Sequence, residues 1–370
     1  MRHNLLKKKP SKVFNFVLIL IFIFIWLYAI YQSPWFLFLL IVPIAHKFLF
    51  KIKIKIFVIY LIISLIPIIL FYFIKQYLFI EHISTWLDHI LHFSCRDGIS
   101  HFINNQYDTK TADFLNLLLL NIKQSSGYDT YQKMIDLSIV YLIVISGLHL
   151  SFMKILIFKL IKIKYLKDII SLSLIFLYSY LLKFSISSTR VLITYVFSLM
   201  FRKNFKNYFD IVSLGAIFIV LCGPSCVFNY GFCMSYGCTF AILTINKLPI
   251  NSELLKQIVI SIVATLICLP FVILMNQQIS VWAVINSFMF GYIFMLIFVY
   301  FLLTFLMFWL APLHLVVVSS IHFIVDSANK LNMLINIKNF SNIIQTSFFL
   351  IICMTLEFLY YKHNLTNKSY

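Results

Sequence analysis

Apolar runs long enough to cross a membrane recur along the chain from Phe14 to the C-terminus, with short polar connections between them. About 18 consecutive apolar residues are enough for a spanning helix, so the pattern predicts an all-α fold: a polytopic transmembrane helix bundle of about 10 to 12 spans. The predicted spans are 13–31, 34–50, 56–74, 137–158, 168–186, 190–201, 211–223, 231–246, 256–275, 281–301, 302–324 and 343–361.

One long interruption, residues 75–136, separates the first spans from the rest. Its first part carries acidic residues and is typical of an exterior loop. Residues 113–123 are rich in leucine but too short to span, and residues 128–136 alternate polar and apolar positions. We therefore expect two short amphipathic or re-entrant helices before the central span, lying at the membrane surface or re-entering it. The predicted units are N-terminal transmembrane helices (1–74), an exterior loop (75–112) and a larger transmembrane domain (113–370).

The composition supports this membrane assignment. Hydrophobic residues make up 62% of the chain, charged residues only 11%, and the mean hydropathy is +0.96. A soluble domain has about a quarter of its residues charged. The sequence therefore predicts an integral membrane protein with no separate soluble domain.

The positions of the basic residues predict its orientation. The chain has 30 lysines and arginines and 12 acidic residues, which gives a net charge of +18. The basic residues cluster at 2–12, 47–55, 159–167 and 202–206. Basic clusters mark cytoplasmic loops, so both termini are expected in the cytoplasm. Attraction to anionic membrane lipid would explain most of the remaining charge. The run 13–31 is too long for a signal-peptide core and lacks a small-residue cleavage site, so we expect an uncleaved first helix.

Cysteines offer no convincing metal site. The spacing of Cys222, Cys226, Cys233 and Cys238 suggests one, but these residues lie in apolar helix without nearby histidine or carboxylate ligands. Buried cysteine commonly acts as a small hydrophobe. We predict no metal and no cofactor. Cys95 lies in the exterior segment and has no obvious disulfide partner.

The first candidate for chemistry is the polar core Ser146-Gly147-Leu148-His149, set inside an apolar run. Polar and ionisable residues at membrane depth cost free energy and commonly mark function. On a continuous helix Ser138, Ser146, His149 and Met153 would share one side. Gly147 would allow close backbone approach or a break that lines a cavity. Alternatively, the histidine bonds a carbonyl of a neighbouring helix and only holds the bundle together.

The second candidate is Arg190, which opens a predicted helix and continues a polar stripe of Ser187, Thr194 and Ser198. An arginine at the centre of a membrane helix costs roughly 2.5 to 3.5 kcal/mol on insertion scales. Its five donors suit a phosphate oxygen better than lipid hydrocarbon. The alternative is an arginine that extends to the exterior headgroups. Lys154 and Lys183 are weaker candidates for the same path.

Two further elements carry polar or small residues within spans. Gly231, Ser235, Tyr236 and Gly237 open one span, and Asn286 lies inside a later one. Small residues let helices pack closely, and a buried asparagine can join helices, so both elements also have a purely structural explanation.

The order and spacing of these elements resemble the membrane domain of the ComEC competence family. A leucine-rich segment (117–121), a short amphipathic stretch (128–136) and the Ser-Gly-Leu-His core (146–149) follow one another as in that family. The later elements agree in order: they are Arg190 after a serine-rich turn, Gly231-Phe232 with Ser235-Tyr236, and Asn286. The resemblance covers residues 113–305.

Some positions depart from the family pattern. Tyr141 stands where the family usually has a histidine, and Cys233 replaces a glutamine. The exterior loop is too short for an oligonucleotide-binding fold, and little chain follows Tyr361 for a C-terminal metallo-hydrolase-like domain. We therefore expect no nuclease activity from this chain.

The resemblance implies a channel in the bacterial cell membrane, formed by residues 113–370, that admits single-stranded DNA during natural transformation. Arg190 with Ser187 and Thr194 would contact phosphate, Ser146, Gly147, His149, Ser235 and Asn286 would line the path, and Tyr141 and Tyr236 would offer stacking surfaces. No phosphate-binding P-loop motif is present, which implies a cytoplasmic helicase-like ATPase as motor. An exterior DNA receptor, membrane lipid and further copies of the chain are the other expected partners.

Two rival functions stay open at this point. An intramembrane hydrolase could use Ser146 as nucleophile with His149, His314 or His322 as base, if the fold brings a base within hydrogen-bond reach. A transporter of a smaller anion or a lipid headgroup could use the same polar surface.

Overall fold

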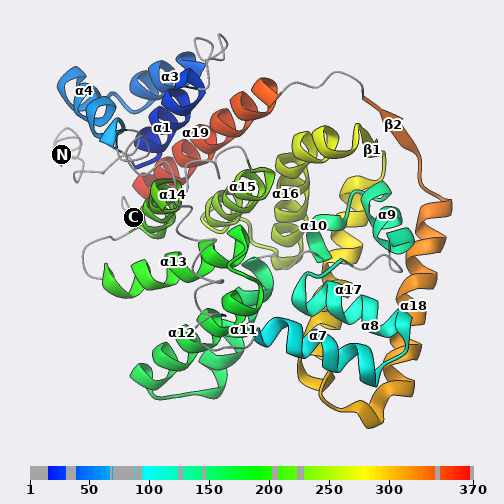
Figure 1. Cartoon of the computed structure of the whole chain (residues 1–370). Helices are drawn as coiled ribbons and strands as arrows, with labels where there is room; N and C mark the ends of the chain where they lie inside the picture. Colours follow the sequence, from blue (N-terminus) through cyan, green and yellow to red (C-terminus); the bar gives the residue numbers. More distant parts are fainter. Residues whose placement is uncertain are drawn as a thin grey trace.

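The computed structural model describes residues 16–30, 39–66, 69, 88, 94–123, 128–143, 147–201, 207–222, 229–337 and 342–366. These residues form a helical bundle with one short two-stranded ribbon, which confirms the all-α class (Figure 1). The helices are α1 (Phe16–Ile30), α3 (Ile41–Leu49), α4 (Ile54–Ile63), α7 (Cys95–Gln106), α8 (Thr109–Leu120), α9 (Tyr128–Asp136), α10 (Val140–Ile143), α11 (Gly147–Leu160), α12 (Lys164–Leu181), α13 (Ile186–Met200), α14 (Tyr208–Cys222), α15 (Tyr230–Ile245), α16 (Glu253–Asn276), α17 (Ala283–Thr304), the 3-10 helix η3 (Phe308–Leu310), α18 (Ala311–Lys330) and α19 (Asn342–Thr366).

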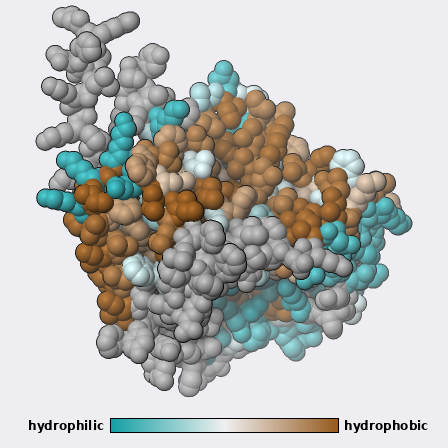
Figure 2. Space-filling view, turned by 90° about the horizontal axis from the view of Figure 1, so that it is seen from above, coloured by the Kyte–Doolittle hydropathy of each residue, from teal (hydrophilic) through white to brown (hydrophobic). Residues whose placement is uncertain are grey.

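Three of these helices are long and apolar enough to cross a membrane on their own: α16, α17 and η3 with α18. Shorter apolar helices occur within α1, α4, α13, α14 and α15. The outer surface carries many exposed isoleucine, leucine and phenylalanine side chains, and Figure 2 shows hydrophobic residues over much of one face. Exposed apolar surface of this extent is expected where lipid replaces water. The chain is therefore a multi-helix membrane protein.

Two apolar cores hold the bundle together. One core joins α1 to α14, α15 and α19, and the other joins α8 to α17 and α18. In Figure 1 the two groups lie on opposite sides of the molecule, with α11, α13 and α16 between them. Residues 111–120 of α8 are all buried, so this helix inserts into the bundle and does not lie on the membrane surface. Of the two placements expected for it, only the inserted one fits.

The predicted span 137–158 is broken. Ser138 has a left-handed backbone (φ 60°), α10 ends at Ile143, and α11 begins at Gly147. The helical wheel that placed Ser138 on one face with His149 was therefore wrong, because the helix is not continuous. Residues 144–146 lie outside the described residues, so a break at Gly147 stays a prediction. The predicted span 302–324 also shifts, because the chain turns at residues 305–310 before α18 begins.

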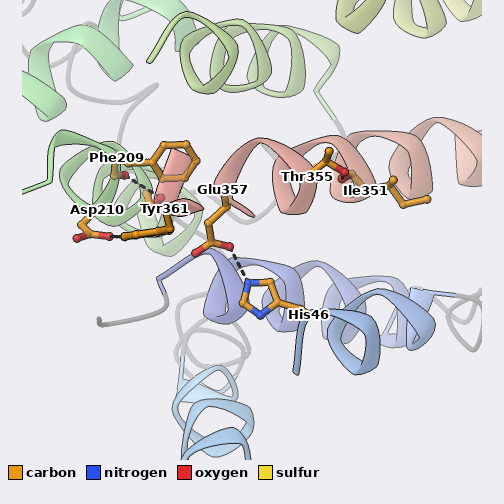
Figure 3. A network of polar contacts seen from close by, with 8 residues as sticks. His46, Phe209, Asp210, Ile351, Thr355, Glu357 and Tyr361 are labelled. Carbon is orange, nitrogen blue, oxygen red and sulfur yellow. Dashed lines mark hydrogen bonds and ion pairs between the residues drawn. The ribbon is translucent and has the colours of Figure 1, made fainter. Parts of the chain in front are cut away.

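Polar contacts fasten the N-terminal helices to the last helix. His46 of α3 points at Glu357 of α19, with 2.6 Å between Nε2 and Oε2, and both side chains are buried (Figure 3). One turn further along α19, the Tyr361 hydroxyl donates to Asp210 at the start of α14. Buried charged groups are stable only when paired, so these contacts fix α3, α14 and α19 relative to one another. The division at residue 74 remains a prediction.

Candidate functional site

Arg190 lies where four helices meet. It follows the first turn of α13, and its side chain is buried, with 9% of the residue exposed. Nη1 donates to the Thr239 hydroxyl of α15, and the guanidinium lies 6.0 Å from the centre of the Tyr236 ring. No carboxylate contacts the guanidinium among the residues that the structure describes, and Nε has no hydrogen-bond partner among them. The site thus holds a buried cation whose donors are partly unused.

Gly147, the first residue of α11, lies against the Arg190 guanidinium. A Cβ built on Gly147 would collide with the Arg190 guanidinium and approach Val191 at 2.9 Å. The glycine is therefore required for the close approach of α11 to α13. The close approach predicted from its position next to the polar core is confirmed.

The surroundings of Arg190 extend along α13 to Thr194. Thr194 is buried, and its Oγ1 lies 3.4 Å from where a Cβ on Gly215 of α14 would stand. The Tyr236 hydroxyl lies 3.7 Å from the same point. Thr194 and Tyr236 therefore belong to one buried polar group with Arg190. Ser187 and Ser235 are only partly buried and lie at its margin on α13 and α15.

His149 does not face Arg190 as directly as Gly147 does. Two residues along a helix turn the side chain by about 200°, so His149 leaves α11 on the side opposite to Gly147. It is 2% exposed, and its ring lies 4.3 Å from the ring of Phe298 on α17. His149 thus contacts α17, while Gly147 contacts α13. Ser146 lies outside the described residues.

A second polar group surrounds Tyr141 of α10. Its hydroxyl lies 2.5 Å from Ser287 Oγ on α17 and 3.3 Å from Thr265 Oγ1 on α16. The Tyr141 hydroxyl therefore connects α10 to α16 and α17.

Two cysteines lie between these polar groups. Sγ of Cys238, next to Thr239 on α15, is 3.5 Å from Sγ of Cys268, one turn beyond Thr265 on α16. Both are free thiols, as expected of cysteines that pack inside an apolar bundle. Their contact makes the polar side chains of α15 and α16 meet inside the bundle. Among the described residues, no three histidine, cysteine or acidic side chains are grouped so as to hold a metal.

A third polar group lies at the end of the bundle where the strands β1 (Gln278–Ser280) and β2 (Leu334–Asn336) pair, here called the ribbon end. The strands are antiparallel, with Ile279 opposite Ile335. The Ser138 hydroxyl accepts from the Ser280 amide at 3.1 Å. Asn286 Nδ2 donates to the Leu137 carbonyl at 3.2 Å and to Ser280 Oγ at 3.4 Å. Asn286 thus holds the corner between α9 and α10, which agrees with the expectation that it joins helices.

The three groups form one string of polar side chains from the ribbon end to Arg190, here called the polar seam. Its members are Ser138, Ser280 and Asn286, then Ser287, Tyr141 and Thr265, then Cys268 and Cys238, and finally Thr239 and Arg190. Asn286 and Ser287 are adjacent in sequence and connect the first two groups. A buried seam of this kind is able to line a path through the bundle.

Sequence reasoning missed several of these residues. Ser280, Ser287 and Thr265 were not singled out, although each is a hydroxyl residue in or beside an apolar helix. The ionisable residues His46 and Glu357 carried the clearest unused signal, since each lies in an apolar segment.

The structure also places the histidines that a hydrolase would need. His314 Nε2 lies 3.2 Å from Thr304 Oγ1, and His322 Nδ1 lies 2.9 Å from Thr130 Oγ1 on α9. The described contacts of both imidazoles are thus with α9, α17 and their surroundings, not with α11.

Comparisons with known proteins agree on one group. A family model described as Competence protein matches residues 118–361, two thirds of the chain. An uncharacterized protein of Mycoplasma genitalium is 30% identical over 190 residues, which are 50% of this chain and 51% of the relative. Its homologue in Mycoplasma pneumoniae is 29% identical over 178 residues, 48% and 47% of the two chains. The chain thus spans about half the length of these curated relatives. No solved structure matches.

Proposed function

Because the chain belongs to the Competence protein family, we propose that it takes part in DNA uptake as a channel that admits single-stranded DNA to the cytoplasm. The polar seam is the proposed lining of that channel, and Arg190 is the proposed phosphate contact. Single strands are commonly held by cationic grooves with aromatic rings as stacking surfaces. The Tyr236 ring, whose centre lies 6.0 Å from the Arg190 guanidinium, is the proposed stacking surface.

One observation carries this proposal: Arg190 is buried, contacts no described carboxylate, and its Nε has no hydrogen-bond partner among the described residues. Burying an uncompensated charge is costly, and a bundle that needed only a structural contact would gain more from an apolar residue. A phosphate oxygen that passes the site would satisfy the free donors, because the planar guanidinium matches phosphate geometry. The free-energy cost of burying the Arg190 charge is then offset only while the DNA phosphate is bound.

The basic clusters support an orientation with both termini in the cytoplasm of the bacterial cell. The ribbon end then faces the exterior, so the seam runs inward from the outer surface. A cytoplasmic helicase-like ATPase would pull the strand, and an exterior receptor would deliver it. Membrane lipid surrounds the apolar faces, and assembly with further copies of the chain is part of the same proposal.

The test is uptake of labelled DNA by a deletion strain that is complemented with the wild-type chain or with Arg190→Ala. We expect Arg190→Ala to lower uptake at least about tenfold at an unchanged membrane level, because one charge-assisted contact is worth about 1.5–3 kcal/mol. Arg190→Lys should restore only part of the uptake, since lysine keeps the charge but not the fork of donors.

A matched control removes a cation elsewhere. Lys247 lies exposed after α15, and Lys247→Ala should leave uptake unchanged. Normal uptake by Arg190→Ala would refute the assigned contact. A deletion that slows growth but leaves DNA uptake intact would instead favour a transporter of a smaller anion or lipid headgroup.

A further inference from the structure

The ribbon end contains a cavity that the polar seam does not account for. Its volume is about 280 Å³, and it is lined by Gln132, Ile135 and Asp136 of α9, Met275 and Asn276 of α16, Gln278 of β1 and Leu334 of β2. Sites for small ligands typically measure roughly 300–1,000 Å³. A cavity just below that range has room for one planar heterocycle, not for a run of stacked nucleotides.

The described lining is rich in amides and has no basic residue. Three side-chain amides and the Asp136 carboxylate offer both hydrogen-bond donors and acceptors, while Met275 and Leu334 supply apolar surface. The Gln132 amide donates to Asp136 Oδ1 at 3.2 Å, which holds the carboxylate in place. A carboxylate repels phosphate, so the lining favours a neutral ligand that donates hydrogen bonds.

The nearest cation on the same helix is already engaged. Lys133 Nζ lies 2.5 Å from Asp129 and 2.9 Å from Asp326 of α18. The hydrogen bond that Lys133 donates to Asp129, followed by that to Asp326, raises the pKa of Lys133 above its ordinary value. Lys133 therefore ties α9 to α18, and no basic side chain among the described residues forms an ion pair with Asp136.

The cavity is joined to the start of the seam. Asn332 Nδ2 donates to the Asp136 carbonyl at 2.9 Å, and Asn332 Oδ1 accepts from Ser280 Oγ at 2.6 Å. Ser280 in turn contacts Asn286. A ligand in the cavity would thus lie directly beside the first polar group of the proposed path.

We propose that this cavity is a nucleobase site, which takes one base of the arriving single strand and prefers cytosine to thymine. The inference rests on the proposed function and names a base contact beside the phosphate contact at Arg190. Cytosine presents an N4 amino donor that a carboxylate accepts, whereas thymine presents the O4 acceptor, which Asp136 repels. The amides of Asn276 and Gln278 are placed to bind the remaining base edge.

The experiment uses the full chain in lipid nanodiscs and two fluorescent homopolymers of equal length, oligodeoxycytidine and oligothymidine. Wild type should bind the cytosine polymer about tenfold more tightly, the discrimination expected from one good base-edge contact. Asp136→Asn should reduce the difference to about twofold or less, because the amide also donates to thymine O4. Leu334→Trp, on the exposed strand, should fill the cavity and remove the preference without altering α9.

Glu253→Gln is the control, since Glu253 lies on α16, which supplies two lining residues, but is itself exposed and does not line the cavity. It should keep the cytosine preference. Equal affinity of wild type for both polymers would overturn the base site and leave the channel proposal standing. Failure of wild type to bind either polymer, together with normal DNA uptake by Arg190→Ala, would overturn both.

Discussion

Gly147 packs so closely against the Arg190 guanidinium that even a methyl group on the glycine would occupy the same space. The two residues lie on different helices, α11 and α13. Within the described part of the Ser-Gly-Leu-His core, Gly147 is the residue that contacts Arg190. The glycine in this motif therefore acts through the arginine.

This contact predicts the effect of Gly147→Ala. The added methyl group must displace Arg190 or separate α11 from α13, and overpacking of this kind costs about 1–3 kcal/mol of stability. We expect DNA uptake to fall to the level of Arg190→Ala, while some protein still reaches the membrane. Gly291→Ala is the control, because a Cβ at Gly291 of α17 meets nothing within 4 Å. Similar uptake in the two variants would contradict the role given to the contact.

The His46 and Glu357 pair predicts a large change in stability. Glu357→Ala would leave the His46 imidazole buried without its hydrogen-bond partner, and an unsatisfied buried polar group typically costs about 1–3 kcal/mol. The midpoint of thermal denaturation in detergent should fall clearly. Glu253→Ala is the control, since Glu253 is exposed and lies 3.8 Å from Lys256, a surface pair worth about 1 kcal/mol at most.

The same pair offers a second, sharper test. Replacing both partners by leucine, His46→Leu with Glu357→Leu, should recover most of the lost stability, because buried pairs replaced by apolar residues are often neutral or more stable. A double variant as unstable as Glu357→Ala would show that the polar contact itself holds α3 to α19.

The long helices, such as α16 and α17, could be predicted because their apolar runs extend over many turns. The helix α7 could not, because it lies in a polar segment that was expected to be an exterior loop. The break at Ser138 was not predicted, and the contact that its hydroxyl makes there is with the amide of Ser280, which lies 142 positions later in the chain. Arg190 and Gly147 could be chosen as candidates because charge and missing side chains are visible in sequence. Their contact, and the roles of Ser287 and Thr265 beside Tyr141, depend on long-range packing that no local pattern encodes.

Tyr141 predicts an energetic coupling between α10 and α17. The family resemblance offers its ring as a stacking surface, whereas the structure shows its hydroxyl 2.5 Å from Ser287. If the hydroxyl is what matters, Tyr141→Phe and Ser287→Ala should be non-additive, with a coupling of about 1 kcal/mol in a double-mutant cycle of unfolding. Tyr141→Phe combined with Ser320→Ala, on the exposed side of α18, should be additive. Full additivity in the first cycle would show that Tyr141 acts through its ring and not through the contact of its hydroxyl with Ser287.

Asn286 predicts how the corner between α9 and α10 is held. Its amide donates to the Leu137 carbonyl and to Ser280 Oγ, so Asn286→Leu would leave both acceptors without this donor. An unsatisfied buried polar group costs about 1–3 kcal/mol, and local opening should become easier by that amount. Hydrogen exchange of the amides in α9 and α10 should therefore accelerate at least about fivefold, while exchange in α14 stays unchanged. Asn251→Leu, in the exposed loop before α16, is the matched substitution and should alter neither segment.

Because the proposed base site is built partly from α9, Asn286→Leu should also weaken the preference for cytosine without touching a residue that lines the cavity. Unchanged exchange in α9 would mean that Asn332 and Ser138 hold the corner without Asn286.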